Sequence, residues 1–241
     1  MNLTKEFIQS LYFEENLSIR KIASRLGVSP SIIMRALEES TLRSKSEAAV
    51  SRYEPLTLVG NFVELAYLVG VYLGDGCLVQ ISRTELLDIA CDSKYHGLIE
   101  RFTNLVIRVF GKAPVLQKDP SSNCVHIRLY GKGINTTLGM DPGPKNRRDL
   151  HIPSWIKENE DFTRWCLRGL FETDGYIHYR RGRNRSVVVG FSNTNESLLD
   201  EIQQLLYNLG YVKFSRNKAR IDCWQYDEAI RFITEVGIEK S

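Results

Sequence analysis

Hydrophobic residues follow a helical period at the N-terminus of the chain. Between Thr4 and Glu38 they recur every three or four positions in three short groups, which predicts three helices. Ser18 can cap the second helix, Gly27 ends it, and Ser29-Pro30 supplies an N-cap and an N1 proline for the third. A helix, a short turn with glycine and a capped helix predict a helix-turn-helix domain over residues 1–42.

Two longer segments, residues 61–140 and 158–241, repeat one order of elements, helix-strand-strand-helix-strand-strand-helix. In the first segment the patterns predict helices at 61–74, 94–110 and 134–138 and strands at 77–83, 86–92, 114–118 and 124–130. In the second segment they predict helices at 161–173, 196–209 and 226–236 and strands at 176–181, 186–192, 211–216 and 219–224. Residues 43–60 are assigned to a linker, and residues 141–157 form a connector that begins with a basic stretch rich in proline and glycine. The predicted fold class is α+β with two pseudo-symmetric halves.

A nine-residue motif occurs twice, at residues 68–76 and 167–175, and equivalent residues are 99 positions apart. Each copy has the pattern of an apolar helix that stops at an acid and a glycine. Gly70 and Gly74 share one helix face, and each costs about 1 kcal/mol relative to alanine in a helix interior. A closely packed partner helix would offset this cost, and the second copy has small residues, Gly169 and Thr173, at the same spacing. We therefore expect the two motif helices to pack against each other.

Asp75 and Asp174 fall at the C-terminal ends of these two helices. The helix dipole disfavours a carboxylate there by roughly 0.3–1 kcal/mol. If the helices pack in parallel, two carboxylates and two negative helix ends meet, an arrangement that favours a divalent cation with oxygen ligands. The backbone carbonyls of Gly74 and Thr173 are further candidate ligands. The alternative is that each Asp-Gly pair only starts a turn, but two copies with matching small residues favour the metal site.

The composition is that of a soluble globular protein, with 43% hydrophobic residues in 241 and no stretch that approaches a membrane span. The first residues contain neither a basic nor an apolar signal region, so we expect an intracellular protein, cytoplasmic or organellar, that is not secreted. The five cysteines form no CxxC pair, which argues against a zinc site or a disulfide framework. A net charge of +3 permits a nucleic-acid partner without requiring one.

The two motif copies resemble the paired signature helices of the LAGLIDADG homing endonucleases, and the duplicated halves with their connector resemble the monomeric form of that family. The resemblance implies two sheets that form a DNA-binding saddle, with the motif helices at the interface between the halves. Because both acids are present, it implies an active, metal-dependent endonuclease that cuts double-stranded DNA and serves intron mobility. The expected cofactor is Mg²⁺ or Mn²⁺, with Ca²⁺ binding without supporting cleavage, and the expected state is a monomer.

The resemblance also implies polar or basic catalytic residues beside the acids, at the end of the second strand and the start of the third helix of each half. By position these are Ser93 or Lys94 and Asn193 at the first location, and Lys132 at the second. A solvated surface role remains open for Lys94 and Lys132. Glu172 takes the place of the family's other acid, where the first copy has leucine, so we interpret Glu172 as structural or as a residue that supports the metal ligands from behind.

Residues 180–185, with the sequence Arg-Arg-Gly-Arg-Asn-Arg, form the predicted tip of a hairpin in the second half. Four guanidinium groups on a tight turn repel one another unless phosphates or guanine edges are near. An ordinary solvated turn rarely has four, although that interpretation stays open. The matching hairpin at residues 82–85 carries one Arg and one Glu, so we expect the halves to read unlike half-sites of a long, non-palindromic target.

The candidate DNA-binding residues form four groups. The hairpin tip contributes Arg180, Arg181, Arg183 and Arg185. The strand ribbons, which fit a major groove, contribute Gln80, Ser82, Arg83, Tyr179, Ser186 and Ser192. The third N-terminal helix contributes Ser29, Ser31 and Arg35. The connector contributes Lys145, Arg147 and Arg148.

Two other functions stay open on the sequence alone. One is a non-catalytic helix-turn-helix transcription regulator that reuses the duplicated fold for binding, and the other is an intron maturase that acts on RNA. The N-terminal helices could also be a cap that binds nothing or another protein. His178 is interpreted as a polar sheet residue, because no His-Asn-His nuclease pattern surrounds it, and His126 and His151 are interpreted as structural.

Overall fold

The computed structural model describes residues 4–15, 17–37, 55–180 and 186–239. The chain divides into two compact units, Met1–Glu54 and Pro55–Ser241. None of the described helices is both long and apolar enough to span a membrane.

The described residues of the first unit contain three short helices: α1 (Lys5–Phe13), α2 (Ile19–Leu26) and α3 (Pro30–Leu37). Ser18 caps α2 by accepting a hydrogen bond from the backbone N–H of Lys21, and Gly27 ends it in the left-handed region with a φ of 66°. A small core joins the three helices; its buried members are Ile8, Leu11, Tyr12, Ile22, Ala23, Ile33 and Leu37. The three predicted N-terminal helices are confirmed.

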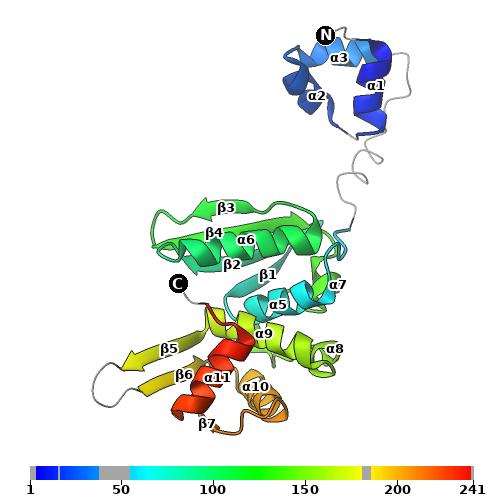
Figure 1. Cartoon of the computed structure of the whole chain (residues 1–241). Coiled ribbons are helices and arrows are strands. Elements are labelled where there is room, and N and C mark those ends of the chain that lie inside the picture. Colours follow the sequence, from blue (N-terminus) through cyan, green and yellow to red (C-terminus); the bar gives the residue numbers. More distant parts are fainter. Residues whose placement is uncertain (1–3, 16, 38–54, 181–185, 240–241) are drawn as a thin grey trace. The chain divides into compact units, whose positions relative to one another are not determined.

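The second unit contains one arrangement of elements twice (Figure 1). The first half consists of α5 (Phe62–Leu73), β1 (Gly76–Ile81), β2 (Thr84–Asp92), α6 (His96–Phe110), β3 (Val115–Lys118), β4 (Cys124–Gly131) and α7 (Ile134–Leu138). The connector contains a 3-10 turn, η1 (Lys145–Arg147), and a short helix, α8 (Ser154–Lys157). The second half consists of α9 (Glu160–Thr173), β5 (Gly175–Arg180), β6 (Ser186–Ser192), α10 (Glu196–Asn208), β7 (Phe214–Asn217), β8 (Arg220–Cys223) and α11 (Tyr226–Val236).

Each half has a four-stranded antiparallel sheet with the same strand order, β1-β2-β4-β3 in the first and β5-β6-β8-β7 in the second. The registers also correspond, because Gly76 pairs with Ile89 in the first sheet and Gly175 pairs with Phe191 in the second. The predicted duplicated α+β fold is confirmed.

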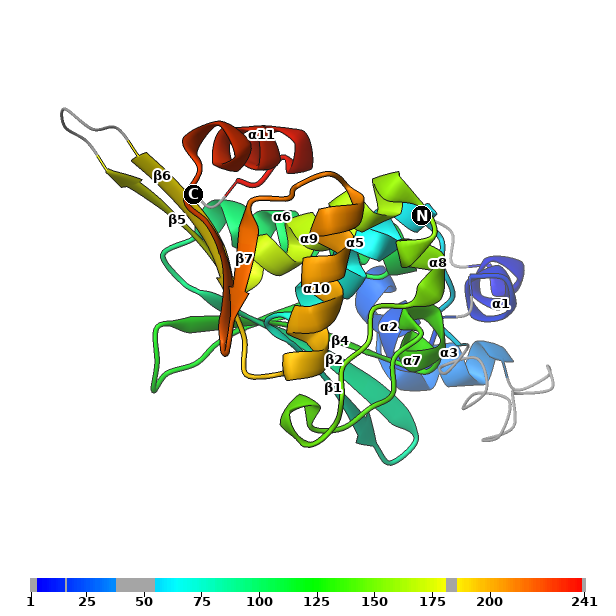
Figure 2. The ribbon, with the colours of Figure 1, turned by 90° about the horizontal axis from the view of Figure 1, so that it is seen from below.

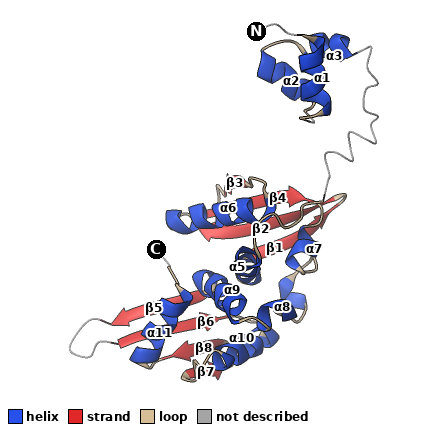
Figure 3. Ribbon diagram, turned by 45° about the vertical axis from the view of Figure 1, so that its right-hand side comes forward, coloured by secondary structure: helices blue, strands red, loops and turns tan. Residues whose placement is uncertain are grey.

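Helices α5 and α9 pack side by side at the centre of the second unit, with one sheet on each side of the pair (Figures 1 and 3). A Cβ atom added to Gly70 would come closer than 3.0 Å to the backbone of Cys166, and one added to Gly169 would come as close to the backbone of Tyr67. A Cβ on Gly74 would collide with the side chain of Thr173. The small residues of the repeated motif therefore let two helix backbones touch, as predicted.

The two sheets turn an apolar face toward the helices and the opposite face outward. In β2 the buried positions alternate along the strand, and Leu87, Ile89 and Cys91 lie in the core. In β6 the core positions are Val187, Val189 and Phe191. The β5–β6 hairpin projects beyond the helices of its half (Figure 2). The residues between the core positions are therefore the ones that form the outer faces.

Two segments differ from the sequence prediction: the start of strand β7 and the last residues of the predicted linker. Strand β7 starts at Phe214 rather than at 211, because Tyr211 is fully buried in the core and the chain turns after it. Residues 55–60, assigned to the linker, run along the first half: the Leu56 N–H donates to the Lys132 carbonyl (2.7 Å) and the Val59 N–H to the Val109 carbonyl (2.8 Å).

The contact of α5 with α9 can be tested with Gly70→Ala. Alanine is favoured over glycine by about 1 kcal/mol in a helix interior, yet we expect a loss of about 1–3 kcal/mol because the added methyl meets backbone atoms that cannot move away. Chemical denaturation measures the change. Glu100→Ala, at an exposed position of α6, should stay within about 0.5 kcal/mol. A stabilised Gly70→Ala variant would contradict the close contact.

Candidate active site

The paired helices bring the two acids of the repeated motif to one end of the helix pair. Gly74 and Thr173, the residues just before Asp75 and Asp174, are in contact with each other. The two acids have equivalent backbone surroundings, since the Asp75 carbonyl accepts from the Ala90 N–H and the Asp174 carbonyl from the Ser192 N–H, both at 3.3 Å. The side chain of Asp75 is exposed and that of Asp174 is half-buried. Both carboxylates therefore emerge where the interface between the halves reaches solvent.

Asn193 holds the carboxylate of Asp174. Its side-chain amide donates to Asp174 Oδ2 at 2.8 Å, and its Oδ1 accepts from the backbone N–H of Asn195 at 2.9 Å. The second contact fixes which way the amide points, so the N–H group faces the acid. The structure thus places Asn193 beside the acid, as its sequence position suggested, while its catalytic role stays a prediction.

A cavity of about 240 Å³ lies beside Asp75, and its lining includes Cys91, Asp92 and Glu172. Burial raises the pKa of the Cys91 thiol to about 12, and the negative charge of Asp75 adds to the rise. Lys94 lies near this cavity, where its ammonium forms an ion pair of 2.7 Å with Asp92. Lys94 therefore lies beside one residue of the cavity lining, and its charge is already paired with that residue.

Lys132 lies at the other end of the first sheet. In the β2–β4 ladder Asp92 pairs with Cys124, whereas Gly131, the residue before Lys132, pairs with Glu85. Seven residues of extended strand separate these two ends, a span of roughly 23 Å at about 3.3 Å per residue. The structure does not bring Lys132 to the acids, because the fourth strand runs away from them.

The connector between the halves reaches the acid pair, which the sequence analysis did not predict. Lys145 Nζ donates to the carbonyls of Tyr72 and Leu73, both at 2.9 Å, and to the carbonyl of Gly74. Burial lowers the pKa of Lys145, while the charges of Asp174 and Asp75 act in the opposite direction. Lys145 therefore points inward at the end of α5 rather than outward to a phosphate.

Arg148 of the connector also turns inward. Its guanidinium donates to the hydroxyl of Tyr72 at 3.0 Å and to the carbonyl of Asp141 at 2.6 Å. Arg147, between these two residues, is exposed. Three connector residues were predicted to bind DNA. Arg147 lies at the surface, whereas Lys145 and Arg148 have intramolecular partners.

Glu172 is a buried carboxylate with a full set of donors. It accepts hydrogen bonds from Arg101 (2.7 Å), from Arg168 (3.0 Å), from the backbone N–H of Glu239 (3.1 Å) and from the hydroxyl of Tyr67. Burial raises the pKa of Tyr67, and the charge of Glu172 raises it further. This network joins α5, α6, α9 and the segment after α11, so the structural interpretation of Glu172 agrees with its contacts.

The comparisons with known proteins point to one fold. A family model described as a LAGLIDADG-like domain matches residues 161–226. A structure of mesophilic variants of the homing endonuclease I-DmoI aligns with a TM-score of 0.53 and 18% identity, covering 75% of this chain and 98% of that one. The chain has the LAGLIDADG fold.

Other proteins with the LAGLIDADG fold match similarly. The homing endonuclease I-WcaI, bound to its DNA recognition sequence, gives a TM-score of 0.52 at 17% identity and covers 84% of this chain and 93% of that one. The N-terminal LAGLIDADG domain of DUF199/WhiA gives 0.51 at 14% identity, with 76% and 87% covered. No curated protein sequence matches the chain significantly. Because these identities are low, the matches establish the fold and leave the activity to be argued from the site.

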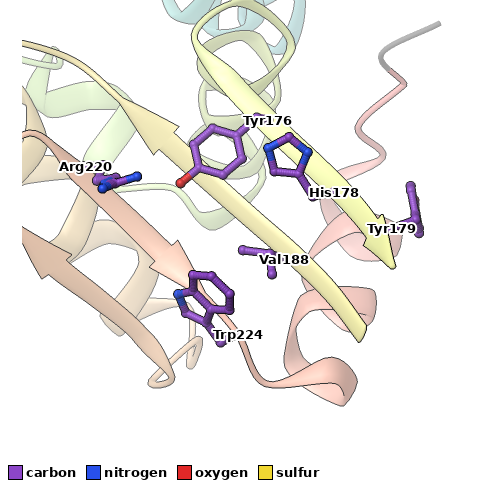
Figure 4. Close-up of a pocket in the computed structure, with 6 residues that line it drawn as sticks. All are labelled: Tyr176, His178, Tyr179, Val188, Arg220 and Trp224. Carbon is purple, nitrogen blue, oxygen red and sulfur yellow. The ribbon is translucent and has the colours of Figure 1, made fainter. Parts of the chain in front are cut away.

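The outer face of the second LAGLIDADG sheet carries a groove of about 540 Å³ (Figure 4). The rings of Tyr176 and His178 pack together at its side, with centroids 5.2 Å apart and planes tilted by 38°, and Arg220 and Trp224 lie across from them. The hydroxyl of Tyr176 donates to Asp222, a carboxylate that is only 5% exposed. Burial and this hydrogen bond raise the pKa of Tyr176 to about 12. Strand parity places these residues on one face, a pattern that could be found in the sequence only once the register was known.

The outer face of the first sheet has a different chemistry. Asp88 lies 2.8 Å from His126 and 2.9 Å from Arg128, so the charges of this cluster balance. Val79 and Ile81 are the exposed apolar residues of β1. The unlike halves inferred from the two hairpins are therefore also unlike across their sheets.

The remaining DNA-binding candidates fall in different places. Gln80 has the parity of core-facing residues, and its amide donates to the carbonyls of Ser82 and Thr84 within the β1–β2 turn. Ser82 and Arg83 are exposed in that turn. Exposed candidates elsewhere are Tyr179 and Ser192 in the second sheet and Ser29, Ser31 and Arg35 in the first unit, while Ser186 is half-buried. Arg181, Arg183 and Arg185 lie outside the described residues, and so does the side chain of Arg180.

The protein groups at the acid pair fit a divalent ion that is shared with DNA. The described part of the chain contains no cluster of three or more His, Cys, Asp or Glu side chains that could hold a metal alone. Two carboxylates suit Mg²⁺ or Mn²⁺, because Mg²⁺ is usually bound by one or two carboxylates while phosphates and water complete its shell. Asp75 and Asp174 are the groups that would hold it. A metal at the Gly74 carbonyl would have to displace Lys145.

The Glu172 network can be tested with Glu172→Ala. The variant removes the buried carboxylate of Arg101 and Arg168 and leaves them only the exposed carboxylate of Glu239, so we expect a loss of about 3–5 kcal/mol in the free energy of unfolding. Chemical denaturation measures it. Arg164→Ala breaks an ion pair with Glu160, whose side chain is 72% exposed, and should change stability by less than about 1 kcal/mol. Equal effects of the two substitutions would contradict a structural role for Glu172.

Proposed function

We propose that the chain is a metal-dependent endonuclease that cuts double-stranded DNA at a long, non-palindromic site. The observation that carries the proposal is the contact between Gly74 and Thr173, which places the residues that follow them, Asp75 and Asp174, at adjacent ends of two helices whose backbones touch. Two carboxylates at the negative ends of helices are disfavoured unless cations are near. An acid at a helix C-terminus in each half is expected if the two acids bind metal ions for the cleavage of both DNA strands.

The chemistry assigned to this site is hydrolysis of a phosphodiester. A bound Mg²⁺ or Mn²⁺ would neutralise charge on the phosphate and lower the pKa of attacking water. Asp75 and Asp174 would hold the ion, and Asn193 keeps the carboxylate of Asp174 in one orientation. Structures of I-DmoI in complex with DNA and Mn support divalent-metal use in this fold. Ca²⁺ is expected to bind without supporting cleavage.

The outer faces of the two sheets would contact the DNA. The second sheet offers Arg220, the adjacent rings of Tyr176 and His178, and Trp224. The first sheet offers a charge-balanced cluster with apolar neighbours. Because a symmetric target would present the same groups to both sheets, these unlike faces support a non-palindromic target. Since both halves belong to one chain, the protein would act as a monomer.

A non-catalytic DNA-binding regulator is the second candidate, and two observations favour it. Where the structure describes the first unit, three helices share a small core, and α3 has exposed polar residues. Lys145 already places a cation at the end of α5. A fold found in homing endonucleases and in WhiA does not decide between the candidates.

Removing either acid tests the proposed reaction. The full chain is incubated with a pooled DNA library and Mg²⁺ or Mn²⁺, and cut products are sequenced. Asp75→Asn and Asp174→Asn should each lower cleavage by on the order of 100-fold or more, because the ion loses its protein ligand, while binding in Ca²⁺ persists. Asp227→Asn, at an exposed position of α11, should cut like the unchanged chain. Binding of specific DNA without cleavage under any metal would favour the regulator.

The role of the first unit is tested with Arg35→Ala. If α3 enters a groove, the variant should weaken binding to the selected site about tenfold and shorten the protected region on the side that α3 covers. Footprinting measures both effects. Lys5→Ala, on α1, removes the same charge and should leave the protected region unchanged. An unchanged footprint in both variants would mean that the first unit does not lengthen the recognition site.

A further inference from the structure

Lys145 is bound at the end of α5 as a metal ion would be bound. Its Nζ atom donates to three consecutive backbone carbonyls, those of Tyr72, Leu73 and Gly74. Three acceptors match the three N–H groups of an ammonium, whereas a neutral amine has only two. These carbonyls carry the negative end of the helix dipole, where a cation is favoured. The side chain is therefore held as a cation at the helix end that precedes Asp75.

The connector that carries Lys145 is also tied to the second acid. The carbonyl of Arg148 accepts a hydrogen bond from the side-chain amide of Asn195 at 2.8 Å. Asn195 in turn donates its backbone N–H to Asn193, which donates to Asp174 at 2.8 Å. Arg148 also donates to the hydroxyl of Tyr72 on α5. One short segment thus contacts the end of α5 and, through two asparagines, the carboxylate of the other half.

We propose that Lys145 is the resident cation of this helix end: a positioning residue that neutralises the α5 carbonyls and keeps divalent ions from using the Gly74 carbonyl as a ligand. The inference rests on the proposed function, because it concerns the same two acids. Divalent ions would then depend on Asp75, Asp174 and DNA phosphates. This assignment replaces the sequence-based expectation that Lys145 contacts DNA and that the Gly74 carbonyl is a metal ligand.

Electrostatic repulsion sets the expected effect. An ammonium and a divalent ion a few ångströms apart repel each other strongly enough, even at the dielectric constant of water, to change metal affinity by on the order of tenfold. Removing the lysine charge would also free three carbonyl oxygens, which are good ligands for hard cations. Loss of the lysine should therefore strengthen metal binding, whereas a lysine that merely stabilised the fold would leave it unchanged or weaken it.

The test measures binding of Mn²⁺ alone to the full chain, by calorimetry and by electron paramagnetic resonance of the bound ion. Lys145→Gln removes the charge but keeps N–H donors for the carbonyls, and it should bind Mn²⁺ at least about tenfold more tightly than the unchanged chain. Lys145→Arg keeps the charge and should bind like the unchanged chain. Lys213→Gln removes one charge at an exposed position before β7 and should also have no effect. Thermal unfolding in a chelator checks folding, and Lys145→Met replaces the Gln variant if that variant does not fold.

Three outcomes separate this inference from the proposed nuclease. Mn²⁺ binding by the unchanged chain that becomes tighter in Lys145→Gln supports both. Binding by Lys145→Gln but not by the unchanged chain supports the resident cation and counts against a metal-dependent nuclease. Equal or weaker binding by Lys145→Gln overturns the inference, whether or not the unchanged chain cuts DNA.

Discussion

The contact between the backbones of α5 and α9 is the constraint on which the rest of the second unit depends. Gly70, Gly74 and Gly169 leave no room for a side chain at this contact. Because the helices touch along their last turns, their ends lie together, and the residues that follow them must also lie together. The two sheets begin at these ends, with Gly76 and Gly175, so the same contact determines where both sheets start.

Three acids near this interface have different surroundings. Glu172 is fully buried, and arginine, tyrosine and backbone donors saturate it. A carboxylate with these partners is satisfied without any ligand and holds the halves together. Asp75 and Asp174 lie at the solvent end of the same helices, where Asn193 donates a hydrogen bond to Asp174 and the charge of Lys145 acts on both acids. The protein therefore separates a structural carboxylate from two that remain accessible to ligands.

The duplicated backbone carries unlike side chains on its two outer faces. The first sheet balances Asp88 with His126 and Arg128, and the second buries Asp222 under Tyr176 beside Arg220 and Trp224. Gly190 permits the second arrangement, because a Cβ there would collide with Tyr176 and Asp222. Backbone symmetry thus coexists with surfaces that would recognise different chemical groups.

Local sequence patterns determined the elements and their order, and α11 and β6 have the predicted bounds because their periodicity, caps and flanking turns lie within a few residues of each other. The repeated motif also determined the helix contact that places Asp75 and Asp174 at neighbouring helix ends, since small residues at one spacing suit a single kind of packing. Only the tertiary structure decided the surroundings of those acids. Strand register places Lys132 at the far end of the first sheet. The side-chain amide of Gln80 donates to the Thr84 carbonyl within its own hairpin. Lys145 binds carbonyls more than 70 positions earlier in the chain. A periodic pattern in the sequence cannot predict this contact, because the contact depends on how the connector folds back over the packed helices.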